Sequence, residues 1–138
     1  MSRVINPETA GKERMHVQRA ILLAIRELTG QETVNSLTYD LIAFIVLSLN
    51  AITDTVDSSV IPWEKRGYWI KADRFRQEWG WTGNLAQRMR DALLKENWAD
   101  VAMLTAQLAS KLSRTKLPVR HGLGTPWLGA WNKLTKSP

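Results

Sequence analysis

Apolar residues along this chain recur at intervals of three and four, which is the spacing of an amphipathic helix. No stretch alternates apolar and polar residues as a half-buried strand does, and no segment of the sequence repeats another. The pattern therefore predicts an all-α protein. We expect a single compact bundle of about five helices, followed by a short C-terminal amphipathic helix.

The first two predicted helices supply the centre of the bundle. The first spans residues 8–29, because Asn6 before Pro7 is a common helix start and Gly30 is a common helix stop. The second spans residues 37–56 and carries apolar side chains on nearly every face. A helix that is apolar all round is surrounded by others, so this one is expected to lie in the core.

The third predicted helix mixes aromatic and basic residues. Residues 57–59 are expected to form a loop, after which Pro62 suits the first turn of a helix that ends near Trp79. Gly67 then lies inside this helix, at a cost of about 1 kcal/mol relative to alanine.

The fourth and fifth predicted helices follow a turn at residues 80–83. The fourth spans residues 84–96, and the fifth begins after the N-cap Asn97 and ends near Ser113. A generic helical hairpin explains the 80–83 turn. A helix-turn-helix unit, with Arg88 on its second helix, is the alternative.

The C-terminal region differs from the rest of the chain. Residues 117–124 contain a proline and two glycines, which predicts an irregular backbone. A short helix after Pro126 would place its apolar side chains on one face. We therefore divide the chain into a helical bundle, residues 1–116, and a basic C-terminal extension, residues 117–138, that docks on the bundle.

Composition narrows the possible chemistry. The chain of 138 residues has no cysteine and two histidines, which excludes disulfide frameworks, thiolate nucleophiles and Cys-ligated metal sites. It shows no N-terminal signal pattern, and its longest apolar run, residues 41–49, is shorter than the ~20 residues of a membrane span. We expect a cytoplasmic protein that does not bind membranes.

Three patterns resemble catalytic or ligand sites, and a plain structural explanation is stronger for each. Glu13 and His16 have the E-x-x-H spacing of a di-metal helix, but the matching second pair is missing. Asp54 and Asp57 could bind a cation or act as acid and base, or belong to a solvated helix end. The glycine loop at 122–126 lacks the Gly-Lys-Ser/Thr ending of a phosphate loop. We expect neither catalysis nor a metal or other cofactor.

Charge is distributed unevenly along the chain, whose net charge is +6. Residues 1–64 hold five basic and eight acidic side chains, whereas residues 65–100 hold eight basic and five acidic ones. After Asp100 there are six basic residues and no acidic side chain. Such asymmetry indicates a polyanionic partner, with a solubilising surface and an incidental basic tail as the alternative.

Basic residues interleave with aromatic residues between Pro62 and Arg76. If they are exposed, they offer cations and stacking surfaces to a nucleic acid; if they are buried, arginine stems cover aromatic rings in the core. The predicted nucleic-acid-binding residues lie in this segment, on the next helix and near the C-terminus. They are Lys65, Arg66, Trp69, Arg74, Arg76, Arg88, Arg114, Lys116 and Arg120.

Two functions fit these observations. In the first, the chain is a non-catalytic basic module that binds RNA or DNA mainly through the phosphate backbone, as a small subunit of a larger nucleoprotein assembly. In the second, it is a protein–protein interaction or homo-oligomerisation module whose exposed anchors are Trp63, Trp127 and Trp131. The second is motivated by seven tryptophans in so small a bundle.

Overall fold

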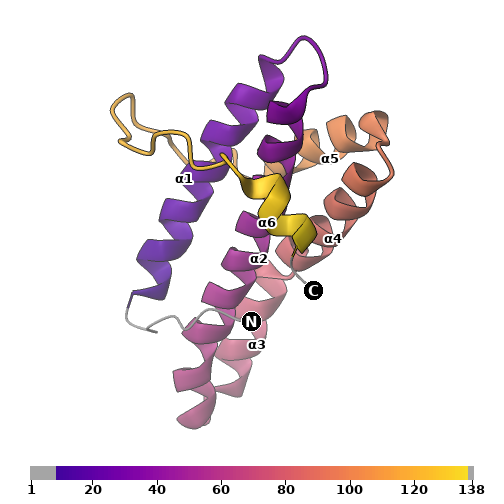
Figure 1. Cartoon of the computed structure of the whole chain (residues 1–138). Coiled ribbons are helices and arrows are strands. Elements are labelled where there is room, and N and C mark those ends of the chain that lie inside the picture. Colours follow the sequence, from indigo (N-terminus) through magenta and orange to yellow (C-terminus); the bar gives the residue numbers. More distant parts are fainter. Residues whose placement is uncertain (1–8, 137–138) are drawn as a thin grey trace.

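Helices account for the regular structure in the computed structural model, which describes residues 9–136 (Figure 1). Five helices form a bundle, and a short sixth helix follows near the C-terminus. The predicted all-α fold is therefore confirmed. The helix start predicted at Asn6 and Pro7 lies outside the described residues.

The long helix α2 (Ser36–Lys65) is the centre of the fold. Helix α1 (Ala10–Thr29) runs antiparallel beside it. Three further helices pack on its other sides: α3 (Trp69–Trp79), α4 (Trp81–Leu94) and α6 (Ala130–Lys136). A capping box fixes the first turn of α2, because the Asn35 side chain accepts hydrogen bonds from Leu37 N and Thr38 N. By length and composition α2 could also cross a membrane, a property that central helices of bundles share.

Helix α2 continues through residues 57–59, where the sequence predicts a loop, so that prediction is wrong. The reason is tertiary: Ser59 Oγ accepts a hydrogen bond from Arg14 at 3.3 Å, and Val60 is fully buried. These contacts hold the polar stretch in the helix. Pro62 consequently lies inside α2 instead of beginning the next helix.

A Schellman motif ends α2, and Gly67 makes it possible. Gly67 has φ +81°, and its N–H donates to Glu64 O at 3.0 Å. The next N–H, that of Tyr68, donates to Trp63 O at 2.8 Å. Glycine adopts this left-handed conformation without strain. Gly67 therefore separates α2 from α3 (Trp69–Trp79), and its predicted place inside one helix is wrong.

Helix α4 (Trp81–Leu94) follows α3 with only Gly80 between them. Gly80 itself has helical dihedral angles, φ −61° and ψ −20°. The side chain of Thr82 is buried, and its hydroxyl donates to Trp79 O at 2.9 Å. The turn predicted at residues 80–83 is therefore wrong, because the chain passes almost directly from one helix into the next.

Helix α5 (Trp98–Lys111) begins after Asn97, as predicted, and Asn97 Oδ1 accepts a hydrogen bond from Asp100 N at 3.2 Å. Between α4 and α5, Glu96 has φ +54°, which is uncommon for a residue with a side chain. The N–H of Asn97 donates to Ala92 O at 2.9 Å and closes a second Schellman motif.

The C-terminal segment packs against α2. Three of its side chains are buried in the hydrophobic core: Trp127, Ala130 and Leu134. On α2, Asp40 accepts hydrogen bonds from the backbone N–H groups of Gly129 at 3.2 Å and Trp131 at 2.9 Å. This carboxylate satisfies N–H groups at the start of α6 (Ala130–Lys136) that have no partner within the helix.

A half-buried arginine joins three helices. Arg14 Nη1 on α1 donates to Thr55 Oγ1 on α2 at 3.2 Å. The guanidinium also lies 4.9 Å from the ring centroid of Phe75 and 5.4 Å from that of Trp79, both on α3. Burial lowers the pKa of Arg14 below its ordinary value, and the negative charge of Glu78 opposes that shift. Arg14 therefore ties α1 to the α2–α3 pair.

Candidate nucleic-acid interface

The junction of α2 and α3 forms one end of the molecule, at the bottom of Figure 1. We call residues 65–74 the tip. Three consecutive side chains of the tip are exposed: Tyr68 by 54%, Trp69 by 63% and Ile70 by 72%. Adjoining large apolar side chains on a surface are informative, because such patches commonly mark interaction sites.

Helix geometry explains why the tip is exposed. Ala72 is 1% exposed and, with the half-buried Phe75 and Trp79, belongs to the part of α3 that packs inward. Tyr68, Trp69 and Ile70 precede this face. The backbone turn also leaves a surface hollow of about 570 Å³, which residues 67–71 line.

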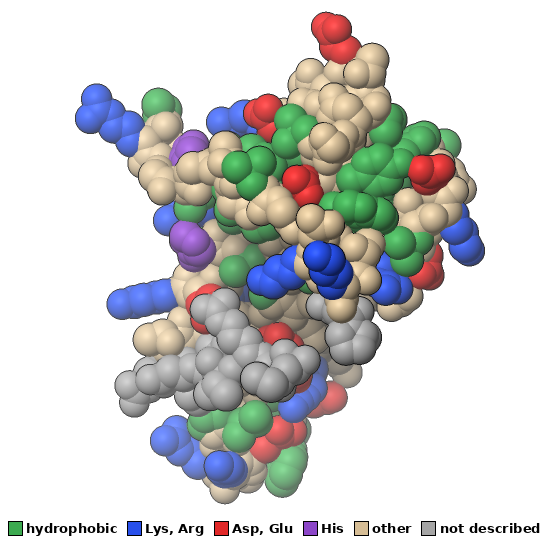
Figure 2. Space-filling view, in the orientation of Figure 1, with side chains coloured by type: hydrophobic (Ala, Val, Ile, Leu, Met, Phe, Trp, Pro, Cys, Tyr) green, Lys and Arg blue, Asp and Glu red, His purple; other side chains and the backbone are tan. Residues whose placement is uncertain are grey.

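Basic residues flank the three exposed apolar residues in the sequence. The tip holds four exposed cations and one carboxylate, and the cations are Lys65, Arg66, Lys71 and Arg74. Among residues 9–136, Lys65, Arg66 and Arg74 make no ion pair. The ammonium of Lys71 lies 4.3 Å from the ring centroid of Trp63. Figure 2 shows basic, hydrophobic and acidic side chains together at this lower end of the molecule.

Two of the predicted binding residues are engaged in contacts between α2 and α3. Arg76 Nη2 lies 3.2 Å from Glu64 Oε1 and 4.0 Å from Asp57 Oδ1. Trp63 is half-buried, and its ring centroid lies 5.3 Å from that of Phe75. Because these contacts join two helices, we leave Arg76 and Trp63 out of the interface.

The remaining predicted cations lie outside the tip. Arg88 is exposed on α4, and three further cations are exposed in the segment after α5: Arg114, Lys116 and Arg120. Figure 1 draws that segment at the upper left, away from the tip at the bottom. The structure therefore does not bring the predicted cations together on one surface.

The two C-terminal tryptophans predicted as partner anchors pack within the chain. Trp127 is 4% exposed, so it is not an exposed anchor. Trp131 is half-buried, and its ring centroid lies 5.0 Å from that of Tyr39. The physical reason is the pair of backbone hydrogen bonds to Asp40, which hold this segment against α2.

Comparison of the chain with known protein families, with curated proteins and with solved structures finds no match. Within residues 9–136, no three His, Asp or Glu side chains gather as a metal site requires.

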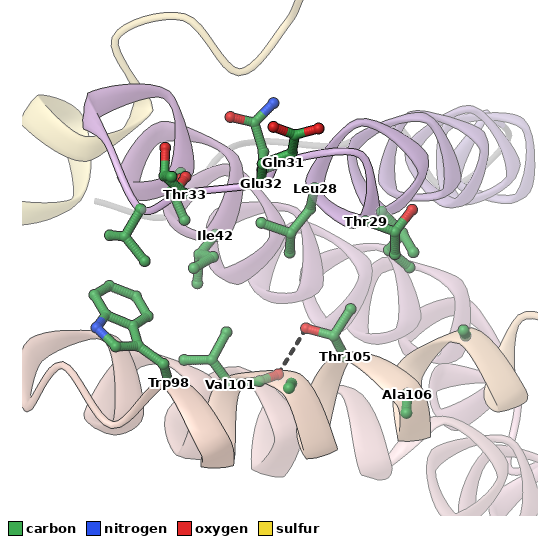
Figure 3. A pocket seen from close by; sticks show the side chains of 15 residues that line it. Leu28, Thr29, Gln31, Glu32, Thr33, Ile42, Trp98, Val101, Thr105 and Ala106 are labelled. Atoms are coloured by element: carbon green, nitrogen blue, oxygen red, sulfur yellow. Dashed lines mark hydrogen bonds between the residues drawn. The ribbon is translucent and has the colours of Figure 1, made fainter.

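An apolar pocket of about 370 Å³ lies between α1, α5 and the start of α2, and no sequence pattern pointed to it (Figure 3). Leu28, Ile42 and Val101 point into it. The hydroxyl of Thr105 turns back to donate to Val101 O at 2.7 Å. Glu32 lies at the rim with its carboxylate directed away from the pocket. No lysine or arginine lines this pocket, so it is separate from the basic tip.

Proposed function

We propose that this chain is a non-catalytic module that binds nucleic acid through the tip, as a small subunit of a larger nucleoprotein assembly. The observation that carries the proposal is the coincidence, at one end of the molecule, of exposed aromatic rings with cations that make no ion pair among residues 9–136. Phosphate contacts account for most of the affinity of such an interface and carry no sequence information. We therefore expect little dependence of binding on base sequence.

The unpaired cations support binding to phosphates in particular. Lys65, Arg66 and Arg74 make no ion pair within the described residues 9–136, so a phosphate need not displace a carboxylate from them. Arg76 differs, because Glu64 already neutralises it at 3.2 Å. Three or four phosphate contacts release about two to three counterions from a single strand. The affinity should therefore fall steeply as salt rises.

The alternative, a protein–protein interaction module, has less support. Of its three predicted anchors, Trp127 is buried, and both Trp63 and Trp131 are half-buried against other rings. Exposed apolar area does remain at the tip, so a chain that binds no oligonucleotide in the test below would favour a protein partner at this site.

The test is fluorescence anisotropy with a labelled oligonucleotide at several salt concentrations between 50 and 200 mM. In the first variant, Lys65, Arg66 and Arg74 are all changed to glutamine. The slope of log affinity against log salt should become less negative by about two, since each phosphate contact contributes about 0.7. An unchanged slope would show that the tip does not contact the nucleic acid.

A matched control separates local contacts from net charge. Lys12, Arg19 and Arg26 are exposed on α1, so changing these three to glutamine removes the same charge elsewhere. This control should leave the slope nearly unchanged. A third variant removes the three cations after α5, at Arg114, Lys116 and Arg120. If only that variant makes the slope less negative, the nucleic acid binds to the C-terminal segment and the proposal for the tip is wrong.

A further inference from the structure

We infer that the tip stacks unpaired bases on Trp69, with Tyr68 as a second ring, and therefore binds single-stranded nucleic acid in preference to duplex. This inference rests on the proposed function, because it names the form of nucleic acid that the same site takes. It adds a requirement that phosphate contacts alone do not impose, namely access to the flat faces of the bases.

Trp69 differs from every other tryptophan in the chain. All seven tryptophans lie within the described residues, and Trp69, at 63%, is the exposed one. Five of the others contact a ring or a cation of the chain: Trp63, Trp79, Trp81, Trp98 and Trp131. The sixth, Trp127, is buried.

The aromatic rings of Tyr68 and Trp69 are available to an external stacking partner. Within residues 9–136 neither Tyr68 nor Trp69 contacts another aromatic ring or a cation. A base that stacks on such a ring buries apolar surface of both partners, and this gain does not depend on which base it is. Bases inside a duplex already stack on each other, so their faces are not accessible.

Cations flank the two rings in the sequence. Arg66 precedes the rings, and Arg74 follows Trp69 by five residues, about 1.4 helical turns, with the exposed carboxylate of Asp73 between them. Each unpaired base brings a phosphate with it, so rings and cations can be engaged by the same short strand. Single-stranded binding sites combine these two features, a basic surface and aromatic platforms.

Ile70 provides the control that tests stacking against general hydrophobic contact. It follows Trp69 directly and is more exposed, at 72% against 63%, but it has no aromatic ring. Stacking requires the indole and not the isoleucine. Insertion into a lipid surface or docking on an apolar protein patch would use both side chains.

The experiment compares a labelled single strand of 12 nucleotides with the duplex formed with its complement, at one salt concentration. The wild-type chain should bind the single strand about tenfold more tightly than the duplex. Trp69→Ala should lower the affinity for the single strand about tenfold and leave the affinity for the duplex unchanged. Trp69→Phe, which keeps an aromatic face, should retain most of the affinity, and Ile70→Ala should lose clearly less affinity for the single strand than Trp69→Ala does.

Each contrary result has a distinct meaning. Suppose that the single strand and the duplex bind equally and that Trp69→Ala changes neither affinity. If removal of the tip cations still makes the salt slope less negative, the proposed function stands and stacking is wrong. If neither oligonucleotide binds at 50 mM salt, the proposed function itself is wrong. If Trp69→Ala and Ile70→Ala lose affinity equally, and phosphatidylserine vesicles bind in the same way, the tip is a general apolar contact and stacking is overturned.

Discussion

The two ends of α2 carry similar aromatic side chains in opposite environments. At its N-terminal end, Tyr39 packs against Trp98 and Trp131, whose ring centroids lie 5.5 and 5.0 Å from its own. Beyond its C-terminal end, Tyr68 and Trp69 make no ring contact within residues 9–136. The C-terminal segment returns to cover the first end, whereas no described segment covers the second.

The charged side chains named at the two ends of α2 also differ in whether they have a partner within residues 9–136. At the N-terminal end, the carboxylates of Asp40 and Glu96 accept hydrogen bonds from groups of the chain itself. At the C-terminal end, Lys65 and Arg66 make no ion pair among the described residues. On our proposal, an aromatic residue belongs to a binding surface where it is exposed beside charges that make no ion pair. The number of tryptophans alone does not indicate such a surface.

The largest predicted effect contrasts one tryptophan from each side of this comparison. Trp127→Ala should lower the free energy of unfolding by about 3–5 kcal/mol, because it leaves a cavity in the core. Trp69→Ala removes an exposed ring and should change that free energy by no more than about 0.5 kcal/mol. Urea unfolding of the two variants measures both values. Equal losses would show that Trp69 is part of the core.

The second prediction concerns the contact that covers the N-terminal end. Asp40→Asn leaves one carbonyl oxygen where two carboxylate oxygens accept from Gly129 N and Trp131 N. We expect a loss of about 1–2 kcal/mol and faster hydrogen exchange across residues 129–136. Asp73→Asn, at an exposed site on α3, is the control and should change little. Unchanged exchange in the Asp40 variant would remove Asp40 from its capping role.

A smaller effect is expected at the turn that creates the tip. Gly67 has φ +81° and open space around the position of an added Cβ, so Gly67→Ala adds backbone strain without a clash. The cost should be about 1 kcal/mol. Gly11→Ala, inside α1, should instead stabilise the chain by up to about 1 kcal/mol. A stabilising Gly67→Ala would contradict the assigned end of α2.

The smallest predicted effect is a pH dependence at the covered end. The hydrogen bond from Tyr39 to Glu96 raises the pKa of Tyr39 above its ordinary value of 10.0, with burial and the charge of Glu96 acting in the same direction. The stabilisation from this hydrogen bond is present below pH 10 and is lost as pH rises through the raised pKa. Unfolding measured between pH 9 and 12 should show this loss in the wild type. Tyr39→Phe should weaken the dependence, and an identical profile would contradict it.

Helical period was enough to predict the fold class and the central place of α2, because apolar residues on nearly every face require neighbours on every side. Element boundaries depended on contacts that local pattern does not contain. Residues 57–59 are helical because Arg14, more than 40 positions away in sequence, donates to Ser59. Gly67, with its positive φ, ends α2 at the point where α3 packs back against it.

The candidate site was predictable in its residue types and not in its extent. The interleaved segment contains the exposed Arg66, Trp69 and Arg74, but its pattern left open whether they face solvent or the core. Spacing alone could not show that Arg76, two positions beyond Arg74, pairs with Glu64 of α2. It also could not show that the cations after α5 lie away from the tip, because their separation depends on how α4 and α5 pack.

We infer above all that an unpaired base stacks on Trp69 and not on a tryptophan packed within the chain. Two-dimensional NMR of the seven indole N–H signals, with Trp69 assigned from the Trp69→Phe spectrum, tests it directly during titration with a 12-nucleotide single strand. We predict that the Trp69 signal shifts most and that the Trp127 and Trp131 signals stay in place. A titration that shifts Trp131 and leaves Trp69 unchanged would contradict it.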